Sequence, residues 1–290
     1  METEALVLRI KEAYGEDLAG EIERGWRAMR KTTFRTNAIK SDDGRTEAEL
    51  KAAGVEYERI NGAFAVGGDR ASFVRELKAY ERGEIYMQSL SSMLPPYALG
   101  ARAGEDILDM CAAPGGKTSQ IVALTGGGAF VTACEKDRFR AERLKHNLAL
   151  MGAGRVNVMV KDACSLDPAM RFDRILLDAP CTGSGTITPS SPGKYSEKLL
   201  ASCVKAQRAL LTKAMTLLKK GGTLVYSTCS LLPEENEEAA KFAVSRGAEL
   251  VGTGLAPERA RLLPTMARGA LLVAPDEYYE GFFVAKFVVK

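Results

Sequence analysis

Short apolar runs alternate with segments of helical spacing from Glu84 onward, and this rhythm constrains the fold more than any other feature. Apolar strands joined by helices in this way predict an α/β fold, a doubly wound parallel sheet with helices on both faces. Helices are expected to begin near residues 117, 137, 197 and 233. The expected strands span residues 107–110, 129–134, 156–160, 174–177 and 223–226, and residues 281–289 predict one more strand at the sheet edge.

Residues 1–84 have a different order of elements and predict a small α+β module. The expected helices span residues 6–14, 17–29, 46–53 and 73–80, and the expected strands span residues 32–39, 55–60 and 63–66. The sequence therefore predicts two domains, at residues 1–84 and 85–290. A loop rich in Pro, Ser, Thr and Gly, residues 186–196, is predicted to be a mobile lid.

The segment DMCAAPGGKT, residues 109–118, joins the first strand of the larger domain to the helix that follows. Its small residues allow a ligand to approach the backbone closely, and the helix start offers free N–H groups, so we expect a nucleotide pocket. Gly116-Lys117-Thr118 resembles the end of a phosphate-binding P-loop, but Cys111 stands where that motif requires glycine. The turn also lacks the GxGxxG of hydride-transfer enzymes. We therefore expect a nucleoside-type cofactor held by its ribose and base.

Acidic residues end three successive predicted strands. Glu135 lies 20 positions after Gly115, where dinucleotide-binding folds place an acidic residue that holds ribose hydroxyls. Asp162 and Asp178 close the next two strands. A single Asp at such a place is often a helix cap or a solvated turn. Three acidic residues at corresponding strand ends favour one shared pocket.

Cys181 and Cys229 each follow a predicted strand among small polar residues. A cysteine hydrolase would need a histidine base, and the one histidine, His146, is predicted to lie on a helix surface. Two thiols beside carboxylates suit addition to an electron-poor ring better than acyl transfer. Cys111 is expected to contribute its backbone to the turn. Three other cysteines are expected to be buried small hydrophobic residues: Cys134, Cys164 and Cys203.

Composition excludes several classes of protein. The net charge is +3 with a pI of about 8.4, below the value of about 9 that marks a strongly basic nucleic-acid-binding domain. The six cysteines include no Cys-x-x-Cys pair, so we expect no disulfide scaffold and no metal site. The N-terminus lacks the pattern of a signal peptide and no apolar run suits a membrane span, so a cytoplasmic location is expected. One basic cluster is predicted to be a solvated helix face, with phosphate binding as the alternative: Arg24, Arg27, Arg30, Lys31 and Arg35.

Three motifs together resemble those of the NOL1/NOP2/Sun family of RNA cytosine-5 methyltransferases. They are DMCAAPGGKT, DAPCTGSGT and YSTCSLLPEENE, and they occur in the family's order. Arg35-Thr36-Asn37 and the segment QSLSS at residues 88–92 resemble the family's N-terminal signatures, and GFFVAKF resembles its last strand. The resemblance extends from about residue 34 to residue 290 and implies a Rossmann-like class I methyltransferase sheet.

The resemblance implies S-adenosylmethionine as cofactor and assigns residues to two roles. Glu135 would bind the ribose, with support from Arg140, and Asp162 would contact the adenine side. The turn would cradle the cofactor, and Asp178 is also assigned to this site. The residues of the turn are Cys111, Ala112, Ala113, Pro114, Gly115, Gly116 and Lys117.

The resemblance also implies the chemistry, in which a thiolate adds to carbon 6 of cytosine and activates carbon 5. Cys229 would be that thiolate, Asp178 would hydrogen-bond nitrogen 3, and Cys181 would assist product release. Pro180-Cys181 has the form of the DNA cytosine methylase nucleophile, so local sequence alone leaves the choice between the two cysteines open.

The chain departs from the family pattern at several points. Residues 187–192 lack the basic segment common after the first cysteine motif, and Pro275-Asp276 and Glu280-Gly281 replace a usual Pro-His and Asp-Gly. A short form without a C-terminal RNA-binding domain is expected, acting as a monomer.

We expect an RNA (cytosine-5) methyltransferase whose N-terminal module presents a flipped cytidine of ribosomal RNA, with transfer RNA as the alternative. Two hypotheses of other classes remain open, a non-catalytic RNA-binding assembly factor and a small-molecule methyltransferase.

Overall fold

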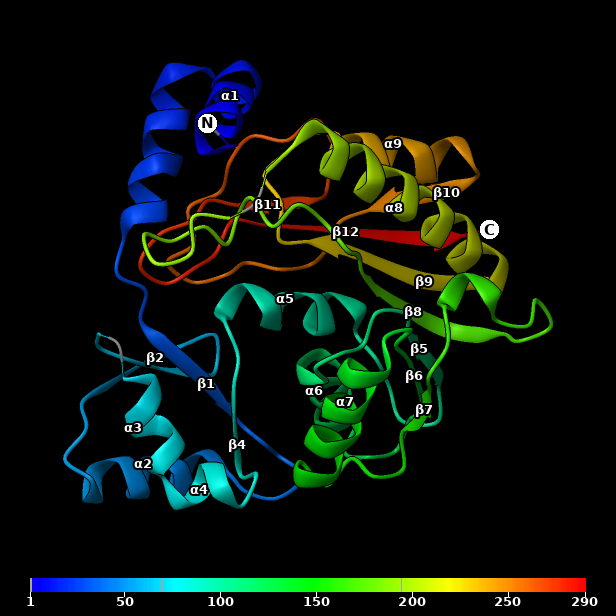
Figure 1. The fold of residues 1–290 in the computed structure, drawn as a ribbon. Helices are drawn as coiled ribbons and strands as arrows, with labels where there is room; N and C mark the ends of the chain where they lie inside the picture. Colours follow the sequence, from blue (N-terminus) through cyan, green and yellow to red (C-terminus); the bar gives the residue numbers. More distant parts are fainter. Residues whose placement is uncertain (1, 69, 194) are drawn as a thin grey trace.

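The computed structural model describes residues 2–68, 70–193 and 195–290, of which the side chains of Glu2 and Thr3 are not considered. These described residues form an eight-stranded sheet in the order β10-β12-β9-β8-β5-β6-β7, with β11 paired to β12, as Figure 1 shows. Neighbouring strands from β9 to β7 are parallel, and β10, β11 and β9 each run antiparallel to β12. The predicted doubly wound α/β sheet is confirmed. The strands are β5 (Asp106–Asp109), β6 (Phe130–Cys134), β7 (Asn157–Met159), β8 (Phe172–Asp178), β9 (Leu218–Thr228), β10 (Ala248–Val251), β11 (Leu271–Val273) and β12 (Phe282–Val289).

The last strand, β12, does not lie at the sheet edge, so that prediction is wrong. It pairs with β9 on one side and with β10 and β11 on the other. Most of β12 is buried, in keeping with a strand that has neighbours on both sides. The prediction failed because β10 and β11 are too short to stand out as apolar runs in the sequence.

Helices cover both faces of this sheet (Figure 1). Alternate residues of a strand point to opposite faces, so Ile107 and Leu108 belong to two different cores. Ile107 packs in the core with helices α5, α6 and α7, and Leu108 packs in the core with α1, α8 and α9. The helices are α1 (Glu2–Arg27), α5 (Leu90–Leu99), α6 (Gly116–Leu124), α7 (Arg138–Leu150), α8 (Glu197–Leu217) and α9 (Glu237–Ser245), with a short 3₁₀ turn η1 (Ala163–Ser165).

Helix α1 consists of the two helices predicted at the N-terminus, which meet at a break at Gly15, where φ is 79°. Its buried residues Leu6, Ile10 and Trp26 belong to the core that α8 and α9 share with the large sheet. Tyr14 donates a hydrogen bond of 2.5 Å to the Leu231 carbonyl. The first helix therefore packs against the larger sheet, although residues 1–84 were predicted to be one module.

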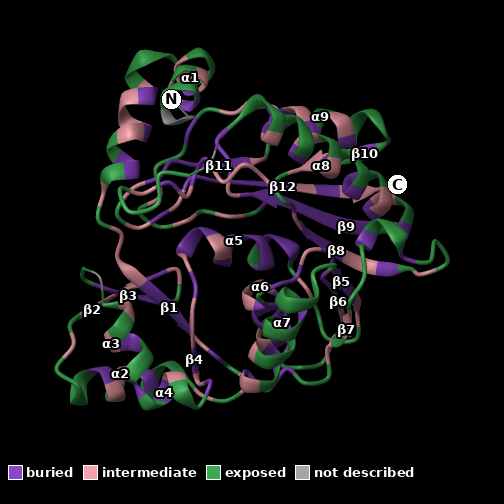
Figure 2. Cartoon of the chain, viewed as in Figure 1, coloured by how far each residue is buried: buried purple, intermediate pink, exposed green. Residues whose placement is uncertain are grey.

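A second, four-stranded antiparallel sheet lies beside the first, in the order β2-β3-β1-β4. Phe34, Leu50 and Phe64 fill its separate core; β1 and β3 are mostly buried, and β2 and β4 are mostly intermediate (Figure 2). The small sheet includes β4, which follows Glu84, so it extends past the predicted domain boundary. Its elements are β1 (Thr32–Thr36), α2 (Asp43–Ala52), β2 (Tyr57–Ile60), β3 (Ala63–Val66), α3 (Ala71–Glu76), α4 (Lys78–Glu81) and β4 (Ile85–Met87).

Candidate active site

The turn between β5 and α6 needs glycine at two positions. Gly115 has a φ of 107°, a conformation that side chains rarely adopt. At Gly116, a Cβ atom would stand 2.9 Å from Cε1 of Tyr86, which is too close for an ordinary contact. These glycines let the turn pack tightly against β4 and α7. The turn residues that precede them, residues 111–114, line a cavity.

A cavity of about 540 Å³ lies at the carboxyl ends of the parallel strands, beside this turn. Glu135 is almost fully buried there and accepts a hydrogen bond of 2.9 Å from the Asp137 amide. Arg140 lies 3.5 Å from the Glu135 carboxylate and donates a hydrogen bond of 3.0 Å to the Ala113 carbonyl, so it connects Glu135 to the turn. The predicted site residues that line this larger cavity are Cys111, Ala113, Glu135, Arg140, Asp162, Asp178, Cys181 and Cys229.

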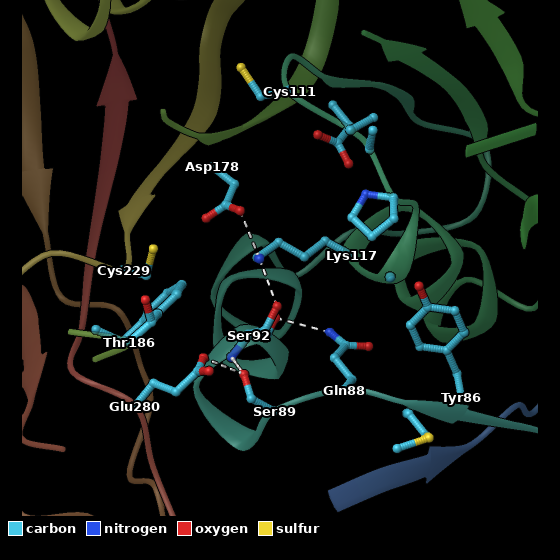
Figure 3. Close-up of a pocket in the computed structure, with 17 residues that line it drawn as sticks. Tyr86, Gln88, Ser89, Ser92, Cys111, Lys117, Asp178, Thr186, Cys229 and Glu280 are labelled. Carbon is cyan, nitrogen blue, oxygen red and sulfur yellow. Dashed lines mark hydrogen bonds and ion pairs between the residues drawn. The ribbon is translucent and has the colours of Figure 1, made fainter. Parts of the chain in front are cut away.

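A smaller cavity of about 340 Å³ adjoins the larger one. Both are lined by Cys111, Ala113, Asp178 and Cys229, so the two cavities meet at a carboxylate and a thiol. Figure 3 shows this smaller cavity with Asp178, Lys117 and Cys229 on one side and Ser89 and Glu280 on the other. The predicted site residues that line only the smaller cavity are Ala112, Pro114, Gly116 and Lys117. Gly115 is not among the described residues that line either cavity.

The two cysteines lie together at this junction. Cys181 follows β8 and Cys229 follows β9, two adjacent parallel strands, and their Sγ atoms are 3.3 Å apart. The Gly185 amide donates a hydrogen bond of 2.9 Å to the Cys229 carbonyl, which joins the two loops. A hydrogen bond with Cys229, together with burial, raises the pKa of the Cys181 thiol. Parallel strands that end at one sheet edge account for this pairing of residues 48 positions apart.

Lys117 lines the smaller cavity and not the larger one, although the sequence predicted it to hold the cofactor together with the rest of the turn. Its Nζ lies 2.8 Å from Asp178 Oδ2 and donates a hydrogen bond of 2.7 Å to Ser92 Oγ (Figure 3). Burial acts to lower the pKa of Lys117, but the Asp178 carboxylate outweighs it and the pKa is raised. Asp178 also accepts a hydrogen bond of 2.7 Å from Ser227. The ammonium group is therefore charged and held in place beside the smaller cavity.

Sequence reasoning did not select Asp109, which also lines the smaller cavity. One carboxylate oxygen accepts a hydrogen bond of 2.7 Å from Thr118, and the other is buried with no partner among the described residues. Burial raises the pKa of Asp109 to about 6. The signal that could have found it is its place at the end of β5, which matches the strand-end positions of Glu135 and Asp178.

The remaining cysteine and histidine predictions have mixed outcomes. Cys134 and Cys203 are buried, as expected, and all six cysteines are free thiols. Cys164 is exposed, so its predicted burial is wrong, because it lies in the short turn η1 rather than in a strand or helix. His146 is exposed on α7, as expected.

The basic cluster is not one solvated helix face. Arg35 is buried and donates hydrogen bonds to Gln88 Oε1 at 2.9 Å and to Ser119 Oγ at 2.9 Å, so it joins β1 to α6. Arg30 donates a hydrogen bond of 3.2 Å to the Ile187 carbonyl, at the start of the predicted lid. Arg24 and Arg27 are exposed. The prediction was wrong for Arg30 and Arg35 because they follow α1, where the chain turns into the small sheet.

The predicted lid, residues 186–196, begins at the smaller cavity, which Thr186 lines. A bridge between Thr188 and Ser191 closes a turn within it, and Lys194 lies outside the described residues. Movement of this loop stays a prediction. Within the described ranges, no cluster of three or more His, Cys, Asp or Glu side chains is placed to hold a metal ion, and no helix is long and apolar enough to cross a membrane.

A comparison with known protein families shows the family to which this chain belongs. The family model of the 16S rRNA methyltransferases RsmB/F matches residues 96–288. The chain belongs to this family. The match confirms the resemblance that the three motifs indicated. The matched residues include the turn after β5, the ends of β6, β8 and β9, and both cysteine loops.

Relatives within and around the RsmB/F family agree with this assignment. A tRNA (cytosine(72)-C(5))-methyltransferase of Pyrococcus horikoshii is 39% identical over 176 residues, which are 60% of this chain and 45% of that protein. A probable ribosomal RNA small subunit methyltransferase B of Bacillus subtilis is 32% identical over 97% of this chain and 65% of that protein. The chain thus spans between about half and two thirds of these relatives.

A solved structure shows the same fold as this RsmB/F family member. The crystal structure of a methyltransferase homolog protein from Pyrococcus horikoshii has a TM-score of 0.85 and is 31% identical, over 97% of this chain and 93% of that one. Because nearly the whole of both chains superposes, the shared fold includes the small four-stranded sheet as well as the large one.

Proposed function

We propose that this chain is an S-adenosylmethionine-dependent RNA (cytosine-5) methyltransferase that acts through a covalent adduct between cysteine and cytosine. The observation that carries the proposal is the thiol pair, 3.3 Å apart, at the junction of two cavities, beside the Asp178 carboxylate and the Lys117 ammonium group. One cavity can hold a cofactor and the other a base; Cys229 lines both, and Cys181 lines the larger one. Membership of the RsmB/F family supports this reading.

The larger cavity fits S-adenosylmethionine. Its volume of about 540 Å³ lies within the range of small-molecule sites, roughly 300 to 1,000 Å³. The buried Glu135 carboxylate can accept hydrogen bonds from ribose hydroxyls, and Arg140 holds Glu135 against the turn. Asp162 lines the same cavity and would contact the adenine side. When bound there, the cofactor would supply an electrophilic methyl group.

The smaller cavity fits a flipped cytosine ring, with Cys229 in reach of carbon 6. Addition of the thiolate forms a carbon–sulfur bond and moves an electron pair into the ring toward nitrogen 3 and oxygen 2. The Lys117 ammonium group, held 2.8 Å from Asp178, can stabilise that charge, and Asp178 is the carboxyl that we place beside nitrogen 3. After methyl transfer the carbon 5 proton passes to solvent, its electron pair restores the double bond between carbons 5 and 6, and the bond from carbon 6 to the Cys229 sulfur breaks. Cys181, with its Sγ 3.3 Å away, can protonate the departing thiolate.

Ribosomal RNA is the first choice of substrate. The family model carries that name, and the relative matched over 97% of this chain is named for ribosomal RNA. Transfer RNA is the alternative, because the relative with 39% identity is named for it. We propose that the small sheet and its helices present the cytidine, and that the protein acts as a cytoplasmic monomer. Asp178, Cys181 and Cys229 are all in place, which favours an enzyme over a non-catalytic assembly factor.

Transfer of labelled methyl groups from S-adenosylmethionine to total RNA that lacks 5-methylcytosine tests the reaction and the substrate together. The RNA is separated by size and the product read at nucleotide resolution. Label as 5-methylcytosine in one size class is the expected result. Bound cofactor with no label in naked RNA or in ribosomal particles would overturn the proposal, and label in free nucleosides would favour a small-molecule methyltransferase.

A further inference from the structure

A buried carboxylate that has no role in the proposed reaction contacts the loop that carries Cys181. Glu235, in the segment between β9 and α9, is fully buried. It accepts hydrogen bonds from the Thr182 amide at 2.9 Å, the Thr182 hydroxyl at 2.6 Å and Gln207 Nε2 at 3.1 Å. No ion pair joins it to a Lys or Arg in the part of the chain that the structure describes. Its charge is therefore not neutralised by a nearby cation.

The contacts of Glu235 fix the loop that carries Cys181. Thr182 directly follows Cys181, and Gln207 also donates a hydrogen bond of 2.9 Å to the Pro180 carbonyl, so both neighbours of Cys181 are held. Both carboxylate oxygens accept hydrogen bonds, which favours the charged form. Burial raises the pKa of Glu235, and these donors act against that rise. A buried carboxyl group is thus fixed next to Cys181.

The other thiol has a cation as its neighbour. Lys117 lines the smaller cavity together with Cys229, and its pKa, which burial acts to lower, is raised first by the Asp178 carboxylate and then by Cys229. A nearby cation favours the thiolate form of a cysteine, and a nearby anion favours the thiol. The two sulfur atoms, although only 3.3 Å apart, therefore have different charged neighbours: the Glu235 carboxylate contacts the Cys181 loop, and the ion pair of Lys117 and Asp178 lines the cavity beside Cys229.

Other titratable groups around the pair come from several elements. The hydrogen bond with Cys229, burial and the Glu235 charge all raise the pKa of Cys181, while the Gly183 amide acts in the opposite direction. Tyr226 of β9 lies close enough to interact with the charges of Cys181 and Glu235. The charged and titratable groups that line the larger cavity with both cysteines are Cys111, Glu135, Lys136, Arg140, Lys161, Asp162, Cys164, Asp178 and Lys205.

We propose that Glu235 is a positioning residue that decides which of the two thiols becomes the nucleophile. It holds the Cys181 loop and keeps the proton on Cys181, so that when the pair loses one proton to solvent, Cys229 becomes the thiolate. Cys181 then donates its S–H to the Cys229 sulfur and keeps a proton close to it. The inference rests on the proposed function, in which Cys229 attacks the base, and it gives a physical reason for a choice that the sequence left to family resemblance.

Alkylation of the full chain with iodoacetamide, without RNA or cofactor, tests this inference. Brief labelling over a range of pH, followed by peptide mass spectrometry, gives a titration midpoint for Cys181 and one for Cys229. In the natural chain, Cys229 should label at lower pH than Cys181. In Glu235→Gln, which keeps the shape of the side chain and removes the charge, labelling of Cys181 at neutral pH should be about tenfold faster, equivalent to a shift of about one unit.

Two further variants separate charge from structure. Glu237→Gln removes another buried carboxylate nearby, one that accepts from Thr265, and should leave the Cys181 midpoint unchanged. Thr182→Val loses one hydrogen bond to Glu235 while the residue 182 amide and Gln207 still donate to the carboxylate, so it should shift the Cys181 midpoint less than Glu235→Gln does. The proposal is wrong if Thr182→Val shifts the midpoint as much as Glu235→Gln does, or if folded Glu235→Gln shifts nothing.

If Glu235→Gln does not fold, the labelling midpoints of Cys181 and Cys229 in the natural chain still test the proposal. Labelling of Cys181 at lower pH than Cys229 would overturn the inference. Because this assay uses neither RNA nor cofactor, its outcome is independent of whether methyl transfer to RNA is found.

Discussion

At the scale of single residues, the surroundings of each side chain decide its role. Cys181 and Cys229 carry the same group, but the Glu235 carboxylate lies behind the first and the Lys117 ammonium group beside the second. The same holds for carboxylates. Asp178 has a cation 2.8 Å away, whereas Asp109 is buried with one oxygen unpartnered among the described residues. These differences lead to two predictions.

Cys229→Ala should abolish methyl transfer to RNA while binding of S-adenosylmethionine persists. In the proposed mechanism the thiolate forms the bond to carbon 6, whereas Glu135, Arg140 and Asp162, the proposed cofactor contacts in the larger cavity, remain in this variant. Methyl transfer and cofactor binding by calorimetry measure the two effects separately. Cys203→Ala, which removes a buried thiol that lines neither cavity, is the matched control and should keep full activity. Activity retained in Cys229→Ala would exclude it as the nucleophile.

Asp109 should make stability depend on pH. Burial raises its pKa to about 6 from an ordinary value of 3.8, so the folded chain binds a proton more tightly there than the unfolded chain. The free energy of unfolding therefore falls as the pH rises from about 4 to about 6. Asp109→Asn cannot ionise and lacks this fall. Relative to the natural chain, it should gain at most about 3 kcal/mol between those pH values.

Urea unfolding of both chains at about pH 4.5 and about pH 7.5 measures this difference. Glu142→Gln, which removes an exposed carboxylate, should show no comparable gain. If the stability difference between Asp109→Asn and the natural chain is the same at both pH values, Asp109 does not carry the raised pKa.

At the scale of helices and strands, the sequence was most informative where apolar runs end in reactive side chains. The turn after β5 and the ends of β6, β8 and β9 were predicted because strand ends converge at one edge of a parallel sheet. Short strands such as β10 and β11 have too few residues to show a pattern. They were not predicted, and β12 was therefore expected at the sheet edge and not inside the sheet. Burial of Arg35 was missed because it depends on α6, which is distant in sequence.

Helix α1 provides a test of how the N-terminal segment packs. At Gly25 a Cβ atom would lie 1.8 Å from the Pro275 carbonyl oxygen, whereas at Gly20 the nearest atom is the flexible Arg24 Nη1 at 3.7 Å. Gly25→Ala should therefore destabilise the fold by about 1 to 3 kcal/mol or more. Gly20→Ala, in the same helix, should be neutral or stabilising by up to about 1 kcal/mol. Thermal unfolding of the two variants compares them, and equal effects would show that α1 does not pack as described.

At the scale of the whole molecule, the site draws on both sheets. Tyr86 of β4 and Gln88, which follows it, line the smaller cavity from the side of the small sheet, while Asp178 and Cys229 line it from the large sheet. A base that enters this cavity would contact both parts of the chain. The smaller cavity is therefore where the N-terminal module can influence which RNA is modified.

The most direct test of the whole account is the covalent adduct itself. Cys181→Ala, incubated with substrate RNA and S-adenosylmethionine, should accumulate a protein–RNA species that survives denaturation, because addition proceeds and release is slowed. Peptide mass spectrometry should place the link on Cys229, and the Cys181→Ala, Cys229→Ala double variant should form no adduct. A link on another residue, or no adduct from a Cys181→Ala preparation that still methylates RNA, would contradict the account.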